Sequence, residues 1–150
     1  MKKEDEKMIG EKLERMNGLL REKARVEREL EEAFRPLCDD MGLAEELYRV
    51  YAAALRENDR EADPGTAENR RKFLFAALYV YSPASLCGRK LRPGLRDRLT
   101  ETVGGITPTS LSHSIEGLSF LYTNYRPFRR DVDHILGRVL ERIGKQTHKV

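Results

Sequence analysis

Residues 92–122 read RPGLRDRLTETVGGITPTSLSHSIEGLSFLY, and this stretch predicts two short helices joined by a tight turn. Pro93 suits the first position of a helix, where its missing N–H is not needed. The apolar side chains that follow recur at helical spacing on one face: Leu95, Leu99 and Val103. The glycine pair at 104–105 predicts the end of this helix, because glycine accepts the left-handed conformation that closes a helix C-terminus.

A second helix start follows at Thr107 and Pro108, which supply an N-cap oxygen and a proline for the first helical position. The apolar stripe of this helix consists of Leu111, Ile115, Leu118 and Tyr122. Two helices with facing stripes and so short a connection must cross at a steep angle and share a small core, which is the helix-turn-helix arrangement. Phe120 lies opposite the stripe, so we expect another element to cover the C-terminal half of this helix.

The outward face of the second helix is the candidate recognition surface, since a DNA-binding helix-turn-helix places the start of that helix in the major groove. The residues expected there are Thr107, Thr109, Ser110, Ser112, His113 and Glu116. Hydroxyl groups can bond to phosphate or to bases, and a helix N-terminus attracts phosphate. This helix carries no Arg, Lys, Asn or Gln before Asn124, although these side chains make the strong bidentate base contacts. The pattern therefore supports contact with DNA better than it supports recognition of a particular DNA sequence.

The segment resembles the tri-helical helix-turn-helix superfamily, especially the response-regulator output domains and the C-terminal origin-binding domain of the bacterial replication initiator. The resemblance is carried by Leu95, Leu99, Val103, Gly104, Ile106, Thr107, Leu111, Ser112 and Ile115. It implies that the second helix is the recognition helix. The chain departs from the tightest form of the pattern by having two glycines and one extra turn residue.

Charge is distributed unevenly along the chain. Residues 1–66 hold 13 Lys and Arg against 18 Asp and Glu, a net charge of −5, whereas residues 67–150 hold 15 against 7, a net charge of +8. A basic half that contains the helix-turn-helix suits DNA binding, because cation–phosphate contacts supply much of the affinity. The cations expected to contact phosphate are Arg89, Lys90, Arg92, Arg96 and Arg98, extended by Arg126, Arg129 and Arg130.

The first part of the chain predicts one long charged helix over residues 3–34. Its narrow apolar stripe consists of Ile9, Leu13, Met16, Leu20, Ala24, Leu30 and Phe34. A narrow seam flanked by charges is typical of a coiled coil, so residues 9–34 are a candidate homodimer interface. The alternative is that this helix folds back on its own chain. Pro36 predicts that the helix ends or bends just before it.

The remaining segments predict an all-α chain of two parts. Helices are expected over residues 43–57 and 67–81, the latter capped by Thr66 and apolar on every side from Phe73. A short helix follows Ser82, and a last amphipathic helix runs from Arg126 to Gly144. The charged loop NDREADPG favours a helical arm at 1–58, a linker at 59–66 and a basic helix-turn-helix domain at 67–150.

No pattern in the sequence supports catalysis or a cofactor. Histidines 113, 134 and 148 lie in separate segments without metal-ligand spacing, and no GxSxG or phosphate-loop motif accompanies the serines or glycines. Asp131 and Asp133 lie on different helix faces, as solvated charges do. Cys38 and Cys87 stand alone, which favours reduced, buried thiols over a disulfide or a metal pair. The polar start and the lack of a long apolar run favour a cytoplasmic protein with no membrane span.

The sequence thus favours a non-enzymatic protein that binds double-stranded DNA, as a transcriptional regulator or a replication accessory. The alternative is a helical adaptor that acts through its N-terminal arm and binds no nucleic acid. This alternative accounts better for the absence of base-reading side chains on the recognition helix.

Overall fold

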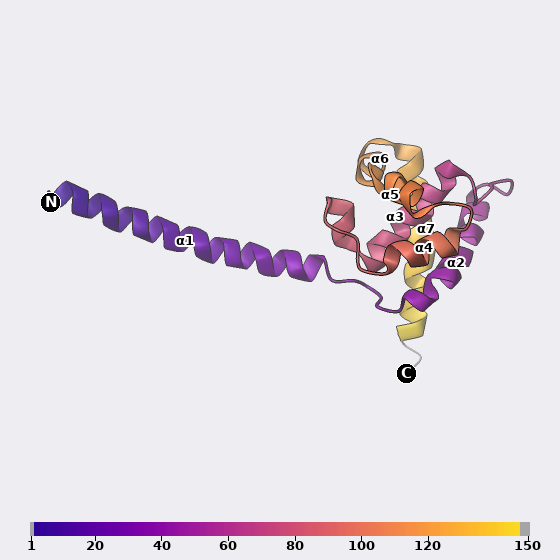
Figure 1. Cartoon of the computed structure of the whole chain (residues 1–150), viewed down its shortest axis with the longest axis horizontal. Helices are drawn as coiled ribbons and strands as arrows, with labels where there is room; N and C mark the ends of the chain where they lie inside the picture. The colour runs from indigo at the N-terminus through magenta and orange to yellow at the C-terminus, as the bar shows by residue number, and fades with distance from the viewer. Residues whose placement is uncertain (1, 148–150) are drawn as a thin grey trace. The chain divides into compact units, whose positions relative to one another are not determined.

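The computed structural model describes residues 2–147, with side chains described as far as Gly144 (Figure 1). All regular structure in this range is helical, which confirms the predicted fold class. The elements are α1 (Lys3–Ala33), the 3-10 helix η1 (Met41–Leu43), α2 (Ala44–Asn58), α3 (Ala67–Tyr81), the 3-10 helix η2 (Pro83–Cys87), α4 (Leu95–Val103), α5 (Pro108–Ile115), α6 (Leu118–Asn124) and α7 (Arg126–Thr147). No helix in residues 2–147 combines the length and apolarity that crossing a bilayer requires.

The described part of the first unit, residues 2–35, is built of the single long helix α1. It ends at Ala33, before Pro36, as the sequence predicts. None of its 31 residues is buried. Its large apolar side chains are exposed, from 36% for Leu30 to 66% for Met8. The predicted stripe is therefore present along α1, and its side chains from Ile9 to Leu30 are exposed.

The described part of the second unit, residues 36–147, is a helical bundle built around α3. This helix contacts α2, α4, α5, α6 and α7, and every residue from Lys72 to Tyr81 except Tyr79 is buried. Thr66 caps its N-terminus by accepting a hydrogen bond from the backbone N–H of Asn69 at 3.2 Å, as predicted. A helix that is apolar all round must be enclosed by others, and here the other helices of the bundle supply that enclosure.

The contacts divide the chain at Pro36 and not at the predicted linker, residues 59–66. Helix α2 packs against α7 and α4, and its buried side chains belong to the same core as those of α3. Tyr51 of α2 is fully buried, and its hydroxyl donates a 2.7 Å hydrogen bond to the carbonyl of Pro64. Burial raises the pKa of this hydroxyl. The loop 59–66 has the charged composition of a domain linker, but its hydrogen bond with Tyr51 attaches it to α2.

The predicted second motif helix is broken in two. Gly117 has a φ of +79° and separates α5 from α6, whereas a single helix was expected to continue to Tyr122. Both pieces still bury part of the predicted stripe, since Leu111 and Leu118 are fully buried. Phe120 of α6 is 69% exposed, so no described element provides the cover that was expected over it.

Three smaller expectations also need correction. Helix α4 starts at Leu95 after a left-handed Gly94, so Pro93 lies before the helix and not at its first position. The thiol-bearing side chains are free, as expected, but Cys87 is exposed and Cys38 only partly buried. The last helix continues past Gly144 to Thr147.

Candidate nucleic-acid interface

The α4–turn–α5 segment has the helix-turn-helix arrangement. Leu95 and Leu99 of α4 and Leu111 of α5 are completely buried, and both helices pack on α3. In the turn, Gly104 and Gly105 adopt φ values of +69° and +66°, which side-chain-bearing residues rarely adopt. Ile106 then packs against the core. The turn and the buried leucines therefore fix α5 on the bundle, with its other face outward.

The N-terminal part of α5 presents its polar side chains to solvent. Thr107, Thr109, Ser110, His113 and Glu116 are exposed, and Ser112 is partly exposed. Thr107 is the N-cap, and its Oγ1 accepts a hydrogen bond from the backbone N–H of Ser110 at 3.1 Å. His113 Nδ1 lies 4.0 Å from the Glu116 carboxylate, and both side chains are more than two-thirds exposed. The structure thus places the six predicted recognition residues on one short helix and its two caps, Thr107 at the N-terminus and Glu116 at the C-terminus.

Replacing Thr107 by Ala should lower the free energy of unfolding by about 1 kcal/mol, because the Ser110 N–H loses its acceptor at the helix N-terminus. Chemical denaturation monitored by circular dichroism measures this change. Thr107→Ser is the matched control, since serine retains the hydroxyl, and its stability should stay within a few tenths of a kcal/mol of the parent. Equal losses in both variants would show that the cap does not stabilise α5.

Arg92 points into the protein and not toward a ligand. Its guanidinium donates to the carbonyl oxygens of Cys38 at 3.3 Å and of Asp39 at 3.0 Å, and its side chain is 26% exposed. Its backbone N–H donates to Ser82 Oγ at 3.2 Å. These contacts hold the start of the bundle against the segment before α4. We therefore assign Arg92 a structural role and leave it out of the candidate phosphate-binding set.

The other predicted cations before and within α4 differ from Arg92. Lys90 and Arg96 are exposed and Arg98 is partly exposed, and none of the three forms an ion pair with a residue of the described part of the chain. Arg89 lines a small cavity that is shared with the end of α5 and the start of α6. These side chains therefore lie in α4 or in the segment just before it, with Arg89 beside the end of α5.

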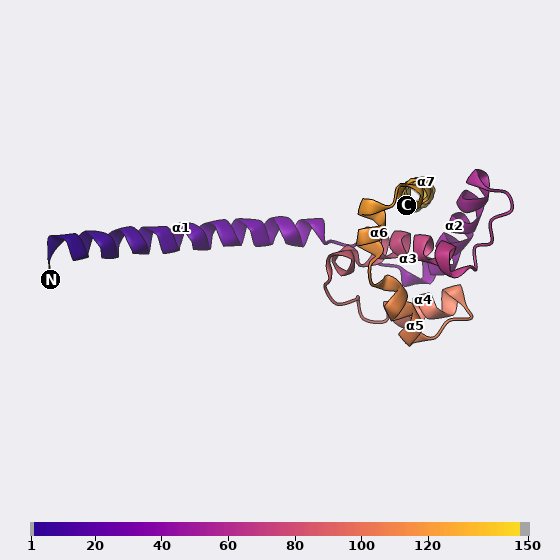
Figure 2. The same cartoon turned by 90° about the horizontal axis from the view of Figure 1, so that it is seen from above.

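The three predicted cations of α7 lie elsewhere. Figure 2 shows α7 on the opposite side of α3 from α4 and α5. Arg126 is exposed at the start of α7. The Arg129 guanidinium stacks over the Tyr122 ring at 5.0 Å from its centroid and lies 4.0 Å from the Asp133 carboxylate. The predicted cations thus form two groups, one around α4 and one along α7, and not a single ring.

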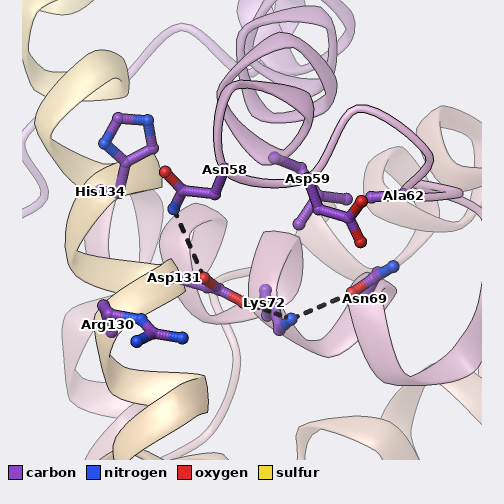
Figure 3. A pocket seen from close by; sticks show the side chains of 9 residues that line it. Asn58, Asp59, Ala62, Asn69, Lys72, Arg130, Asp131 and His134 are labelled. Atoms are coloured by element: carbon purple, nitrogen blue, oxygen red, sulfur yellow. Dashed lines mark hydrogen bonds and ion pairs between the residues drawn. The ribbon is translucent and has the colours of Figure 1, made fainter.

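Arg130 belongs to a polar pocket that the sequence did not indicate (Figure 3). The pocket has a volume of about 620 Å³ and is lined by Leu55, Asn58, Asp59, Ala62, Asn69, Lys72, Arg130, Asp131 and His134. At its base, the Lys72 ammonium donates to Asp131 at 2.7 Å and to Asn69 at 3.0 Å. Asn58 donates to the second Asp131 oxygen at 3.4 Å.

The pocket shows that Asp131 is not the solvated charge that its sequence position suggested. The side chains of Lys72 and Asp131 are only 10% and 20% exposed, and each satisfies the other's charge. At the rim, His134 Nε2 has no hydrogen-bond partner and lies 3.8 Å from Glu57. Hydrogen bonds from Arg138 lower the pKa of the Glu57 carboxyl. Nothing in the sequence indicates that Lys72 pairs with Asp131, because the two residues are far apart along the chain.

No cluster of three His, Cys, Asp or Glu side chains suited to hold a metal ion occurs in the part of the chain that the structure describes. The polar groups of the pocket are mostly paired with one another. The exposed face of α5, with the cations around α4, is therefore the candidate interface.

Comparison of the chain with protein-family models, with curated proteins and with solved structures found no match.

Proposed function

We propose that the protein binds double-stranded DNA by placing the N-terminal half of α5 in the major groove. The observation that carries this proposal is the exposed, hydroxyl-rich start of α5, held by a glycine turn and by leucines buried against α3. A recognition helix needs this combination of a fixed backbone and an unobstructed outer face. Thr109 and Ser110 can approach the groove closely because their side chains are small.

Phosphate contacts in this proposal come from Lys90, Arg96 and Arg98, with Arg89 beside the end of α5. The first helix of the motif crosses the DNA backbone in this docking geometry, and Arg96 lies in the first turn of α4. Lys90 lies in the segment just before that helix. Lys90, Arg96 and Arg98 form no ion pair within the described residues, so they can exchange water and counterions for phosphate at little cost to the fold.

The proposed binding discriminates only modestly between sequences. Residues 108–115 of α5 carry no Arg, Lys, Asn or Gln, so the strong bidentate base contacts are missing. The side chains available for base edges are the hydroxyls of Thr109 and Ser110 and the imidazole of His113. Most of the binding free energy would therefore come from the phosphates, which suits a replication accessory or a regulator that relies on a second chain.

A second candidate function has one observation in its favour. Helix α1 exposes its whole apolar stripe, and none of its residues is buried. Such a helix suits pairing with another helix, either in a homodimer through residues 9–34 or in an adaptor that recruits a different protein. An adaptor would bind its partner through α1 and would not respond to DNA.

The variant Lys90→Gln/Arg96→Gln should weaken binding to unrelated DNA duplexes to a similar extent and should reduce the salt dependence. Loss of two phosphate contacts makes the negative slope of log K against log salt shallower by about 2. Fluorescence anisotropy with two duplexes of different sequence, at several salt concentrations, measures both effects. Both residues are exposed, so the variant should unfold like the parent.

The matched control is Arg28→Gln/Arg60→Gln, which removes the same charge at exposed positions of other elements. If binding falls equally in the control, the cations act through net charge alone. If the parent protein does not bind duplex DNA at low salt while it forms dimers, DNA binding is excluded and the adaptor function is favoured.

A further inference from the structure

The apolar part of the α1 stripe is flanked by opposite charges. Along the stripe, in steps of three and four residues, an acidic position precedes the apolar ones and a basic position follows them. We call these positions the seam: Glu6, Ile9, Leu13, Met16, Leu20, Lys23 and Glu27. The four apolar side chains are 42–61% exposed, and those of Lys23 and Glu27 are 71% and 64% exposed. In a helix pair the charges at the ends of the seam need partners of opposite sign.

We propose that the seam pairs with the seam of a second copy of this chain in an antiparallel manner, about a twofold axis between residues 14 and 15. The axis places Leu13 of each chain opposite Met16 of the other, and Ile9 opposite Leu20. Every apolar side chain of the seam therefore faces another apolar side chain. This inference specifies the homodimer proposed above, and it does not depend on DNA binding.

The same axis pairs the charges of the seam. Glu6 of each chain lies opposite Lys23 of the other, and the twofold symmetry forms this pair twice. Glu27 lies opposite Lys2, the N-cap of the other α1, where the helix dipole also favours a negative charge. The seam thus complements its own reverse in both apolarity and charge, so a second copy of this chain is the partner that fits it.

The residues on the two flanks of the seam are compatible with close packing. One flank carries Gly10, Asn17 and Ala24, whose small side chains let the two backbones approach. The other flank carries Leu19, which is 54% exposed and would lie against the methylene stem of Lys12 of the second copy. The pair therefore covers apolar surface outside the seam as well.

A parallel, in-register pair is disfavoured by the charged seam positions. It would place Glu6, Lys23 and Glu27 each against its own copy, so like charges would lose water without gaining a partner. The order of charges along the seam therefore favours the antiparallel orientation.

A second antiparallel register would pair Lys23 with Glu27. It overlaps only residues 17–33 of the two helices, so it covers Val26 and Leu30 but leaves most of the apolar seam unpaired. The proposed axis overlaps a longer part of α1 and pairs the whole apolar seam. Leu30 then lies beyond the pair, and at 36% it is the least exposed large apolar side chain of α1.

Cysteine cross-linking of the full chain tests the register. Cys38 and Cys87 are first replaced by Ser, and the single variants Ile9→Cys and Leu20→Cys are made in this background. Mixed under reducing conditions and treated with a short bismaleimide, the two variants should give a cross-linked dimer, because residue 9 lies opposite residue 20. Each variant alone should not, since the two copies of either residue lie about 16 Å apart along the helices.

The matched control is a mixture of Glu11→Cys and Gly18→Cys, which lie opposite each other in height but on the outer faces, and it should not cross-link. Cross-linking of either single variant alone shows a parallel pair, and cross-linking of Leu20→Cys with Leu30→Cys shows the second antiparallel register. Either result overturns the proposal, as does a dimer in which residues 9 and 20 do not cross-link. A single-chain mass by light scattering excludes the homodimer itself, whether or not the protein binds DNA.

A charge exchange tests the same register without cysteine. Lys23→Glu should raise the dissociation constant of the dimer about tenfold, because the new carboxylate faces Glu6 of the other chain. Adding Glu6→Lys should restore the affinity, since the pair is then only reversed. The parallel pair and the second antiparallel register give no such recovery. Sedimentation equilibrium measures the dissociation constants, and a loss that is absent, or that Glu6→Lys does not recover, overturns the proposed axis.

Discussion

Asp131→Ala should lower the free energy of unfolding by about 3–5 kcal/mol, the largest loss that we expect from a single polar substitution in this protein. The Lys72 ammonium is buried at the base of the polar pocket, and Asp131 is its carboxylate partner at 2.7 Å. Without that partner, a desolvated positive charge remains between α3 and α7, with only Asn69 to accept from it. Urea denaturation monitored by circular dichroism measures the loss.

The control for this prediction removes both charges. Lys72→Met combined with Asp131→Ala should be clearly more stable than Asp131→Ala alone, because no unpaired buried charge is left. Comparing the double variant with both single variants, Lys72→Met and Asp131→Ala, isolates the interaction of the pair from the packing around it. A loss below about 1 kcal/mol in Asp131→Ala would instead place the pair among ordinary surface ion pairs.

Arg92→Ala should lower the free energy of unfolding by about 1.5–3 kcal/mol, since a charged donor to two backbone carbonyls is lost. The carbonyls of Cys38 and Asp39 would then lose their side-chain partner at the start of the bundle. Thermal and urea unfolding measure the change. DNA binding, measured well below the melting temperature, should stay close to that of the parent, because the Arg92 guanidinium faces inward.

Arg92→Lys distinguishes geometry from charge. Lysine keeps the positive charge, but it lacks the planar fork that reaches two carbonyls at once, so the variant should recover only part of the stability. Arg96→Gln, at a nearby exposed position, should leave stability unchanged. If Arg92→Ala unfolds like the parent but loses DNA affinity as Lys90→Gln/Arg96→Gln does, Arg92 is a phosphate contact after all.

Features set by local sequence could be predicted well. The end of α1 before Pro36, the Thr66 cap of α3 and the enclosure of residues 73–81 follow from rules that act within a few residues. The exposed hydroxyls of α5 also follow from helical periodicity, because Leu111 fixes which face is buried.

Features set by long-range contacts could not be predicted. Arg92 looks like any other cation in a basic segment, and only the fold brings the carbonyl of Cys38 within reach of it. Lys72 and Asp131 likewise meet only because α3 and α7 pack together. The break at Gly117 was missed for a different reason: the apolar stripe continues across it, since two separate helices contact the same core.

The attachment of the second unit's first residues to α3 has a mechanical consequence. The backbone N–H groups of Leu37 and Cys38 donate to the carbonyl of Val80, and the Tyr81 hydroxyl donates to the carbonyl of Asp40. A pull along the chain from Arg35 is therefore resisted first at the C-terminal end of α3, the helix that also supports α5. A force applied through the residues before Pro36 would therefore act directly on α3, because the segment between them is hydrogen-bonded to that helix.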